Sequence, residues 1–408
     1  MFHNKKIFIF ISIVVLFSTS LYANDSFSLT GYYKNFFTIL NPPNSLIMDG
    51  KTRFSDSNNI RLDINWAIYK STFFNTAYNL SAKIQDPGLF SLNEDENKSI
   101  SYRVDDLNPL LYGPEGSFGI YQNLDRAYFS GNLGFADLFL GRQAIAWGGA
   151  RVINPTDVIV PFQISDIDKE ERIGVDALRL RIPTGELNEL DIGCVFGKDF
   201  EFKESALYVR NRAHPLNTDL TLIAIDFKEH LLVGLDIARS IRGAGFWCET
   251  AYTFSYLFND SKRDKNEDYL RLSTGLDYSF TDKFYGYFEY HFNEPGATNT
   301  DDYLSAQQKA AFTDGSVYLL SEQYLIPGFS YQITALTMMN ISSLINILDN
   351  SLFLSPNIEY NIFEDFYLSL GAFIGIGKEP EEISNTPVYK SEFGSYTDLY
   401  FTSLRIYF

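Results

Sequence analysis

The chain has 408 residues and a formal net charge of −18, with 51 acidic against 33 basic residues. So acidic a chain excludes nucleic acid as an expected partner, because phosphate backbones attract basic surfaces. Aromatic residues make up 16% of the chain, chiefly 36 Phe and 27 Tyr, a content typical of proteins that carry aromatic girdles at two membrane interfaces.

The N-terminus predicts a cleaved signal peptide over residues 1–23. Lys5 and Lys6 precede the apolar run from Ile7 to Phe17, and a small-residue site ends at Ala23. The run is too short for a spanning helix, which needs about 20 residues. Residues 24–408 contain no other long apolar run. If they form a membrane protein, it must be a closed barrel, because only helices and barrels satisfy their backbone in lipid.

The first clear strand candidate, 58–70, alternates apolar and polar side chains. Its apolar members are Ile60, Leu62, Ile64, Trp66 and Ile68, and Arg61, Asp63 and Asn65 lie between them. This period of two gives an extended strand one apolar and one polar face. In a membrane barrel the apolar row contacts lipid and the polar row faces the interior.

Similar segments recur along the chain and predict eighteen strands. They are 26–40, 58–70, 73–85, 121–131, 135–147, 173–183, 187–197, 204–212, 218–228, 231–241, 244–257, 267–280, 284–294, 322–333, 336–347, 352–362, 366–377 and 396–408. The connections between them alternate between short turns and long segments. We therefore predict an all-β, transmembrane antiparallel β-barrel of about 18 strands (16–18), with short periplasmic turns and long extracellular loops.

The chain ends YFTSLRIYF, in which Tyr400, Thr402, Leu404, Ile406 and Phe408 share one strand face. This ending resembles the C-terminal strand signature of bacterial outer-membrane proteins. The resemblance implies a Gram-negative outer-membrane location, contact with outer-membrane lipid, and recognition of the Phe408 strand by the barrel-assembly machinery.

A barrel of this size is too wide for side chains alone to fill, so we expect a water-filled interior. The charged members of the inward rows are candidate pore-lining residues: Arg61, Asp63, Arg126, Arg142, Arg179, Arg181, Arg271, Asp277 and Glu289. Residues 148–172 are a candidate pore-constricting loop. Its candidate residues are Asn154, Pro155, Asp157, Asp166, Asp168, Glu170 and Glu171.

Two interpretations of these charges stay open. Either an acidic inward loop faces a basic wall and creates a transverse field, or the arginines pair with carboxylates of the interior and have a structural role. Within the loop, Asn154-Pro155-Thr156-Asp157 predicts a helix start, with Asn154 as the cap. The apolar residues that follow, from Val158 to Phe162, require cover, so the segment should pack against the wall.

This region also resembles a loose group of porin-like barrels that includes alginate-export-type proteins. The shared pattern is Gly-Arg-Gln…Trp-Gly…Asn-Pro-x-Asp, here Gly141, Arg142, Gln143, Trp147, Gly148, Asn154, Pro155 and Asp157. The resemblance implies an outer-membrane channel and no particular solute. The excess of acidic residues argues against the export of a polyanion.

The sequence contains no pattern of catalytic or metal-ligating residues, so we expect no enzyme, no cofactor and no metal. The favoured function is a porin-like channel for passive diffusion of small hydrophilic solutes. Two alternatives remain. One is a closed barrel that acts as an adhesin or structural anchor, and the other is an exporter or transporter of a polymer or a hydrophobic compound.

Overall fold

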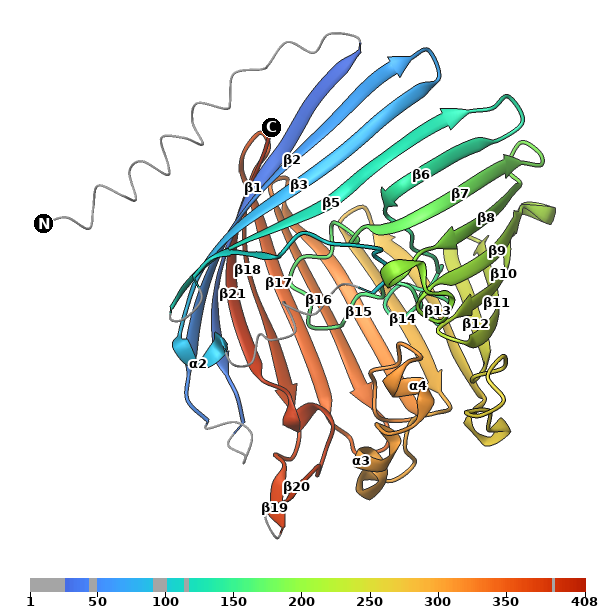
Figure 1. Cartoon of the computed structure of the whole chain (residues 1–408). Helices are drawn as coiled ribbons and strands as arrows, with labels where there is room; N and C mark the ends of the chain where they lie inside the picture. The colour runs from blue at the N-terminus through green and yellow to red at the C-terminus, as the bar shows by residue number, and fades with distance from the viewer. Residues whose placement is uncertain (1–25, 44–49, 91–100, 114–116, 384–385) are drawn as a thin grey trace, which may run out of the picture.

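The computed structural model describes residues 26–43, 50–90, 101–113, 117–383 and 386–408. The predicted signal peptide, 1–23, lies outside the described residues. The rest forms a closed antiparallel barrel of 18 strands (Figure 1), which confirms the predicted fold class.

The strands of the wall pair in chain order, and each predicted strand is present. They are β1 (Phe27–Asn41), β2 (Arg53–Tyr69), β3 (Thr72–Gln85), β5 (Phe118–Asn132), β6 (Asp137–Gln143), β7 (Val175–Pro183), β8 (Glu189–Val195), β9 (Ala206–Ala213), β10 (Asp219–Phe227), β11 (His230–Ile241), β12 (Ala244–Phe254), β13 (Tyr269–Thr281), β14 (Phe284–Asn293), β15 (Gln323–Thr334), β16 (Thr337–Asn346), β17 (Leu352–Phe363), β18 (Phe366–Ile376) and β21 (Asp398–Tyr407). Strand β21 pairs with β1 in the register Tyr32↔Tyr407, which closes the barrel without a free edge.

Shorter elements lie in the connections between the strands of the wall. They are the strands β4 (Leu110–Tyr112), β19 (Glu381–Ile383) and β20 (Thr386–Val388), the helices α2 (Pro87–Phe90), α3 (Tyr303–Ala306) and α4 (Ala310–Thr313), and the 3₁₀ turns η2 (Lys198–Phe200), η3 (Phe202–Glu204), η4 (Pro215–Asn217), η5 (Lys265–Glu267), η6 (Thr300–Asp302) and η7 (Phe393–Ser395). In the described part of the chain, no helix is long and apolar enough to cross a membrane.

The connections are sorted by length between the two ends of the barrel. The end at which β1 begins and β21 ends has tight turns, such as 242–243, 282–283 and 364–365. The other end carries long segments, including 294–322 and 377–397 (Figure 1). The sequence predicted this arrangement of short turns at one end and long loops at the other. It is typical of transmembrane β-barrels.

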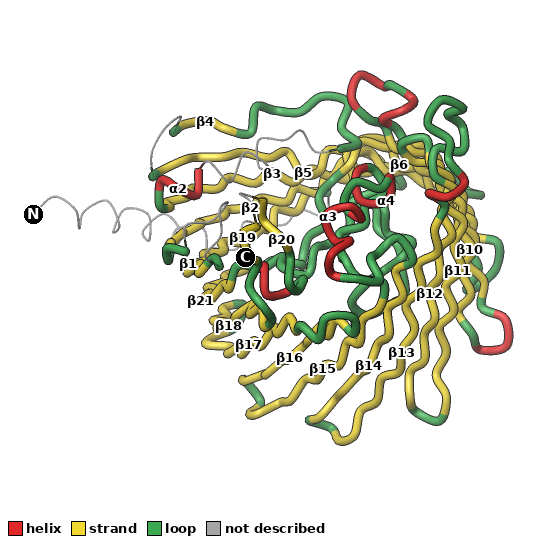
Figure 2. The backbone as a smooth tube through the Cα atoms, turned by 90° about the horizontal axis from the view of Figure 1, so that it is seen from below, coloured by secondary structure: helices red, strands yellow, loops and turns green. Residues whose placement is uncertain are grey.

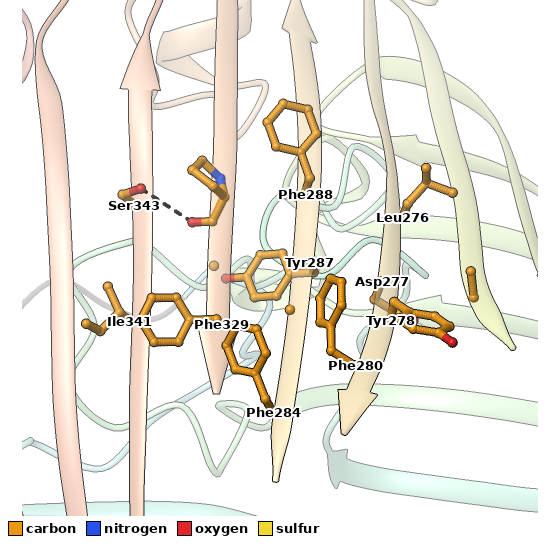
Figure 3. Close-up of a pocket in the computed structure, with 14 residues that line it drawn as sticks. Leu276, Asp277, Tyr278, Phe280, Phe284, Tyr287, Phe288, Phe329, Ile341 and Ser343 are labelled. Carbon is orange, nitrogen blue, oxygen red and sulfur yellow. Dashed lines mark hydrogen bonds between the residues drawn. The ribbon is translucent and has the colours of Figure 1, made fainter. Parts of the chain in front are cut away.

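Side chains alternate between the outside and the interior, as the period of two requires. Trp66 is 50% exposed on the outward row of β2, whereas Arg61 is only 2% exposed on the inward row. An apolar groove of about 610 Å³ crosses the outward face from β13 to β16. Figure 3 shows the rings of Phe280, Phe284 and Phe329 gathered beside it. These rings lie near the tight turn after β13, where an aromatic belt is expected at a membrane interface.

Strand β10 keeps this alternation, but its inward row is mainly apolar instead of polar. Leu222 is 52% exposed on the outward row, and Ile223, Ile225 and Phe227 are buried on the inward row. The inward residues pack in a cluster with Val158 and other residues of the connection after β6. The interior of the barrel therefore contains an apolar core of the kind found in water-soluble domains.

A pair of arginine substitutions on β17 tests which face contacts lipid. Ile358 lies near mid-strand on the outward row and is 43% exposed. Ile358→Arg should reduce the free energy of folding into vesicles by roughly 2–4 kcal/mol, because a charge at mid-depth must enter hydrocarbon. The measurement is equilibrium folding into lipid vesicles with increasing urea.

The matched control is Ser355→Arg, which places the same charge on the inward row of β17. We expect a loss of less than about 1 kcal/mol there, since the interior row tolerates charge. Equal losses for both variants would contradict the assignment of faces.

Candidate functional site: an inward loop held by the barrel wall

The connection between β6 and β7, residues 144–174, crosses the inside of the barrel (Figure 1). Here it is called the inward loop. Seen from below (Figure 2), loops and the helices α3 and α4 gather within the ring of strands. The inward loop contains the predicted constriction segment, 148–172, and it has no α-helix or strand of its own.

Two glycines of the sequence pattern allow the chain to leave the wall. Gly141, near the end of β6, has a φ of +119°, and a Cβ there would lie 2.3 Å from the carbonyl oxygen of Ala127. Gly148 has a φ of +114°, and its Cβ would lie 2.3 Å from Oδ1 of Asn154. Only glycine fits both the left-handed backbone and the close approach. The Gly-Arg-Gln…Trp-Gly…Asn spacing therefore has a steric explanation.

The apolar residues of the inward loop pack against the wall, as predicted. Val158 and Ile159 are 2% and 4% exposed and belong to the same cluster as Ile223 of β10. Trp147 lies edge-on to Tyr208 of β9, with ring centroids 4.6 Å apart. This burial holds one side of the loop on strands β7 to β12.

A buried carboxylate on β12 binds the backbone of the first part of the loop. Glu249 is fully buried, and it accepts hydrogen bonds from the backbone N–H groups of Gly149 (2.9 Å), Ala150 (3.1 Å) and Thr156 (2.8 Å). The hydroxyl of Thr156 donates a fourth bond, at 2.7 Å. These bonds satisfy donors that an irregular segment cannot satisfy internally.

A second buried carboxylate, on β14, binds the next three residues. Glu289 accepts bonds from the N–H groups of Arg151 (2.9 Å), Val152 (3.3 Å) and Ile153 (3.0 Å). The indole N–H of Trp247 donates to it at 3.1 Å. Charge-assisted bonds of this kind are about twice as strong as neutral ones, so the two carboxylates fix the path of the loop.

Strand β13, which lies between these two strands, completes the attachment. Ser273 donates its hydroxyl proton to the carbonyl of Ile153 at 2.6 Å, and His291 contacts the same hydroxyl at 2.8 Å. Both side chains are fully buried. Arg151 pairs with Asp277 at 2.5 Å. Because Ser273 uses its proton on the loop, the Ser–His contact serves to hold the backbone.

The predicted helix start at Asn154 is wrong. The chain makes only a turn there, in which the N–H of Asp157 donates to the carbonyl of Asn154 at 3.2 Å. The N–H and hydroxyl of Thr156 both bind Glu249 instead, and Asp157 pairs with Arg172 at 2.8 Å. Glu249 of the wall therefore binds an N–H group that would have no hydrogen-bond partner within the first turn of a helix.

The last part of the inward loop reaches the opposite side of the barrel. Lys34 of β1, which is fully buried, pairs with Asp168 at 2.8 Å and also with Glu170. Glu170 further binds Arg405 at 3.2 Å and the hydroxyl of Tyr407 at 2.5 Å. The acidic end of the loop therefore contacts a basic wall at β1 and β21.

The other predicted acids of the loop behave differently from one another. Glu171 lies 3.4 Å from Arg126 and 3.7 Å from Arg61. Asp166 accepts a bond from the N–H of Gln163 at 2.7 Å and so acts within the loop. Among the residues that the structure describes, no three His, Cys, Asp or Glu side chains form a group able to hold a metal ion.

Most of the predicted inward arginines pair with carboxylates of the barrel interior, which is the second interpretation given above. The pairs are Arg61 with Asp63 (2.9 Å) and Asp125 (2.6 Å), Arg126 with Asp125 (2.5 Å), Arg142 with Asp176 (2.8 Å) and Asp106 (2.9 Å), Arg179 with Asp191 (2.6 Å), and Arg181 with Glu189 (2.5 Å). Arg271 is different, because it makes no ion pair with any described residue.

The sequence analysis missed Glu249, Ser273 and Lys34. Each lies on an inward row of a predicted strand, so alternation alone could have placed all three in the interior. Their partners could not be predicted, because the contacts join residues far apart in the sequence.

A third buried carboxylate lies at the end of the barrel that carries the long loops. Glu392 accepts bonds from the N–H of Leu320 (2.9 Å), the hydroxyl of Tyr324 (2.6 Å) and the amide of Asn346 (2.9 Å). Its own N–H donates to Asp349 at 2.7 Å. Burial raises the pKa of Glu392 to about 7. Glu392 of the connection 377–397 thus binds 294–322 and strands β15 and β16 through its side chain, and 347–351 through its N–H group.

The structure is thus a closed antiparallel barrel of 18 strands with a loop fixed across its interior. No protein-family model matches the chain, and no curated protein matches it in sequence. Solved outer-membrane porins are similar in structure. OccK5 (OpdH) of Pseudomonas aeruginosa is 8% identical with a TM-score of 0.58, and 94% of this chain and 98% of that chain are covered.

Two further porins give a comparable agreement. OccD3 (OpdP) of Pseudomonas aeruginosa is 10% identical with a TM-score of 0.54, covering 94% of this chain and 91% of its own. OccAB4 of Acinetobacter baumannii is 9% identical with a TM-score of 0.54, covering 94% and 98%. At these identities the likeness establishes the fold.

A substitution of Glu289 tests whether its carboxylate holds the inward loop in place. Glu289→Gln replaces an acceptor of charge-assisted bonds by a neutral amide. We expect the local opening of 151–153 to become easier by roughly 1.5–3 kcal/mol, the value of hydrogen bonds to a charged group. The measurement is amide hydrogen exchange of these residues in the folded barrel.

The matched control is Glu189→Gln, which removes a carboxylate that pairs with Arg181 and does not contact the loop. Exchange of 151–153 should stay at the wild-type rate in this control. Wild-type exchange in Glu289→Gln as well would show that the loop is held by other contacts.

The raised pKa of Glu392 predicts loosening of the long loops as the pH rises. An acid whose folded-state pKa lies above its ordinary value of 4.5 favours folding when it is protonated. Its contribution is complete below that value and is lost as the pH rises through about 7. Exchange protection of 316–322 and 391–397, corrected for the intrinsic rate, should fall between pH 5 and pH 8 by on the order of tenfold.

The control for this prediction is Glu392→Gln, which cannot ionise. Its protection should be independent of pH over the same range. A pH dependence that survives in this variant would show that Glu392 is not the group responsible.

Proposed function

We propose that the chain is an outer-membrane channel through which small hydrophilic solutes diffuse passively. The observation that carries the proposal is the inward loop, which hydrogen bonds to Glu249 and Glu289 hold inside an 18-strand barrel. A barrel of this width that only anchored a protein in the membrane would not need a segment fixed across its interior. The signal-like N-terminus and the strand ending at Phe408 support the same location.

In this proposal the inward loop sets the width of the path, and the charged inward rows set the field along it. The inward rows around the path carry Arg61, Asp63, Arg126, Arg142, Arg179, Arg181, Arg271, Asp277 and Glu289, and the loop carries Asn154, Pro155, Asp157, Asp166, Asp168, Glu170 and Glu171. Of these, Arg61, Arg142, Glu289 and Asp157 are buried, so the path itself is lined by more exposed members such as Asp63, Arg181 and Glu170. Since most of these arginines are paired, the field that a solute meets comes from charges of both signs at close range. The tight turns would face the periplasm and the long loops the outside.

We also propose that the barrel-assembly machinery recognises the C-terminal strand. Phe408 lies at the seam, where its N–H donates to the carbonyl of Gly31 at 3.0 Å and its carbonyl accepts from the N–H of Gly31 at 2.8 Å. The last residue therefore takes part in closing the barrel, which supports a role late in assembly.

Conductance in planar bilayers tests the proposed function. The purified, folded protein should show discrete channel steps. A variant in which a short Gly-Ser linker replaces 152–168 should conduct more than the wild type, by about twofold or more, because the segment no longer narrows the path. The control deletion, 198–203, removes an exposed stretch at η2 and η3 and should leave the conductance unchanged.

The outcomes separate this function from the alternatives. A folded protein without channel steps, in both wild type and the 152–168 replacement, would favour a closed barrel that acts as an adhesin or anchor. Flux of hydrophobic compounds without ion conductance would favour the transporter alternative.

A further inference from the structure

A cavity of about 410 Å³ lies between the inward loop and the barrel wall. The loop lines one side from Arg151 to Arg172, and Arg271, Tyr287 and Ser342 of the wall line the other. Its volume falls in the range of small-molecule sites, which are about 300–1,000 Å³. Glu249 and Glu289 hold the loop side of this cavity, so its shape is fixed before any ligand enters.

The guanidinium of Arg271 is buried in this cavity without a counter-ion. The side chain is 4% exposed, and its Nε is buried with no hydrogen-bond partner among the described residues. Two carboxylates lie nearby without forming an ion pair with Arg271. Glu249 accepts four bonds from the loop. Asp157, which also lines the cavity, pairs with Arg172 through Oδ2, and its Oδ1 has no hydrogen-bond partner among the described residues. The paired arginines of the same wall show that the barrel readily supplies carboxylates elsewhere.

A second cation faces the same cavity. Lys169 lines it, and its ammonium group donates to the carbonyl of Ile164 at 3.3 Å. In the part of the chain that the structure describes, Lys169 has no carboxylate within salt-bridge distance. The cavity therefore carries two cations that form no ion pair with a described carboxylate.

An unpaired buried guanidinium costs several kcal/mol of desolvation unless another group compensates it. A planar oxyanion matches its donors in a two-pronged geometry. The remaining lining is mixed. Phe162, Ile164, Tyr287 and Tyr318 supply apolar surface, and polar groups come from Asn154, Asp157, Gln163 and Ser342. The aromatic members favour a ligand with an apolar body, and the polar members can bind its oxyanion end.

We infer that this cavity is a binding site for a small organic anion, with an oxyanion group on Arg271 and an apolar body between Phe162 and Tyr287. The inference rests on the proposed function, since the ligand would be a solute that pauses on its way through the barrel. Arg271 contacts the anion, Lys169 attracts it to the entrance, and the loop carboxylates position the walls.

Calorimetric titration of the full-length protein in detergent with 3-phenylpropionate tests the site. The wild type should bind saturably and Arg271→Gln about tenfold or more weakly, as expected for the loss of a charge-assisted pair. Arg271→Lys, which keeps the charge and loses the planar fork, should lie between them. The control Arg212→Gln removes an arginine elsewhere in the barrel and should bind like the wild type.

Two further measurements exclude a merely structural role for Arg271. The neutral amide of the probe, 3-phenylpropionamide, should bind weakly to wild type and Arg271→Gln alike. Hydrogen exchange of 149–156 should be the same in both proteins. Equal binding of acid and amide, or unchanged affinity in Arg271→Gln, would overturn the inference.

Competition identifies the oxyanion. Displacement of the probe by inorganic phosphate as well as by acetate would extend the site to oxyanions in general, and displacement by acetate alone would restrict it to carboxylates. Channel steps without probe binding would reject the site and leave the proposed function standing. Probe binding without channel steps would reject the proposed function and leave the site standing.

Discussion

The backbone donors of the inward loop impose the constraint on which the interior depends. A segment without regular structure inside a barrel cannot pair its N–H groups with itself, and each unpaired buried group is costly. Glu249 and Glu289 accept six of these bonds between them. Three consecutive strands, β12, β13 and β14, supply the acceptors and Ser273, so the wall acts as a template for a loop that has no fold of its own.

The sequence was sufficient to predict the strands of the barrel wall, but it predicted the structure of the inward loop only in part. Alternation along β2 or β17 depends only on which face meets which solvent, so local patterns were sufficient to predict those strands. The Gly141 and Gly148 pattern also marked where the chain leaves the wall. The turn at Asn154 was predicted as a helix, because its local signals are those of a helix start, whereas the donors of Thr156 bind Glu249 from another strand.

For the charged residues of the interior, too, the sequence predicted the position of a side chain but not its partner. That Arg179 and Arg181 point inward follows from the strand pattern, but their pairing with Asp191 and Glu189 depends on the register between β7 and β8. Most of the positive charge is neutralised at short range in this way. Arg271 is informative because it departs from that pattern, and only a three-dimensional view separates a paired from an unpaired guanidinium.

The long sequence separation of the loop contacts has a consequence for the order of folding. Gly149 binds an acceptor 100 residues later and Arg151 one 138 residues later, and Arg405, which binds Glu170, belongs to the last strand. Contacts between such distant parts form late, since the chain entropy of closing large loops must be overcome first. The acidic end of the inward loop can therefore dock only as the seam between β1 and β21 closes, and in a partly assembled barrel this end of the crossing segment stays hydrated while the part bound to Glu249 and Glu289 can already be in place.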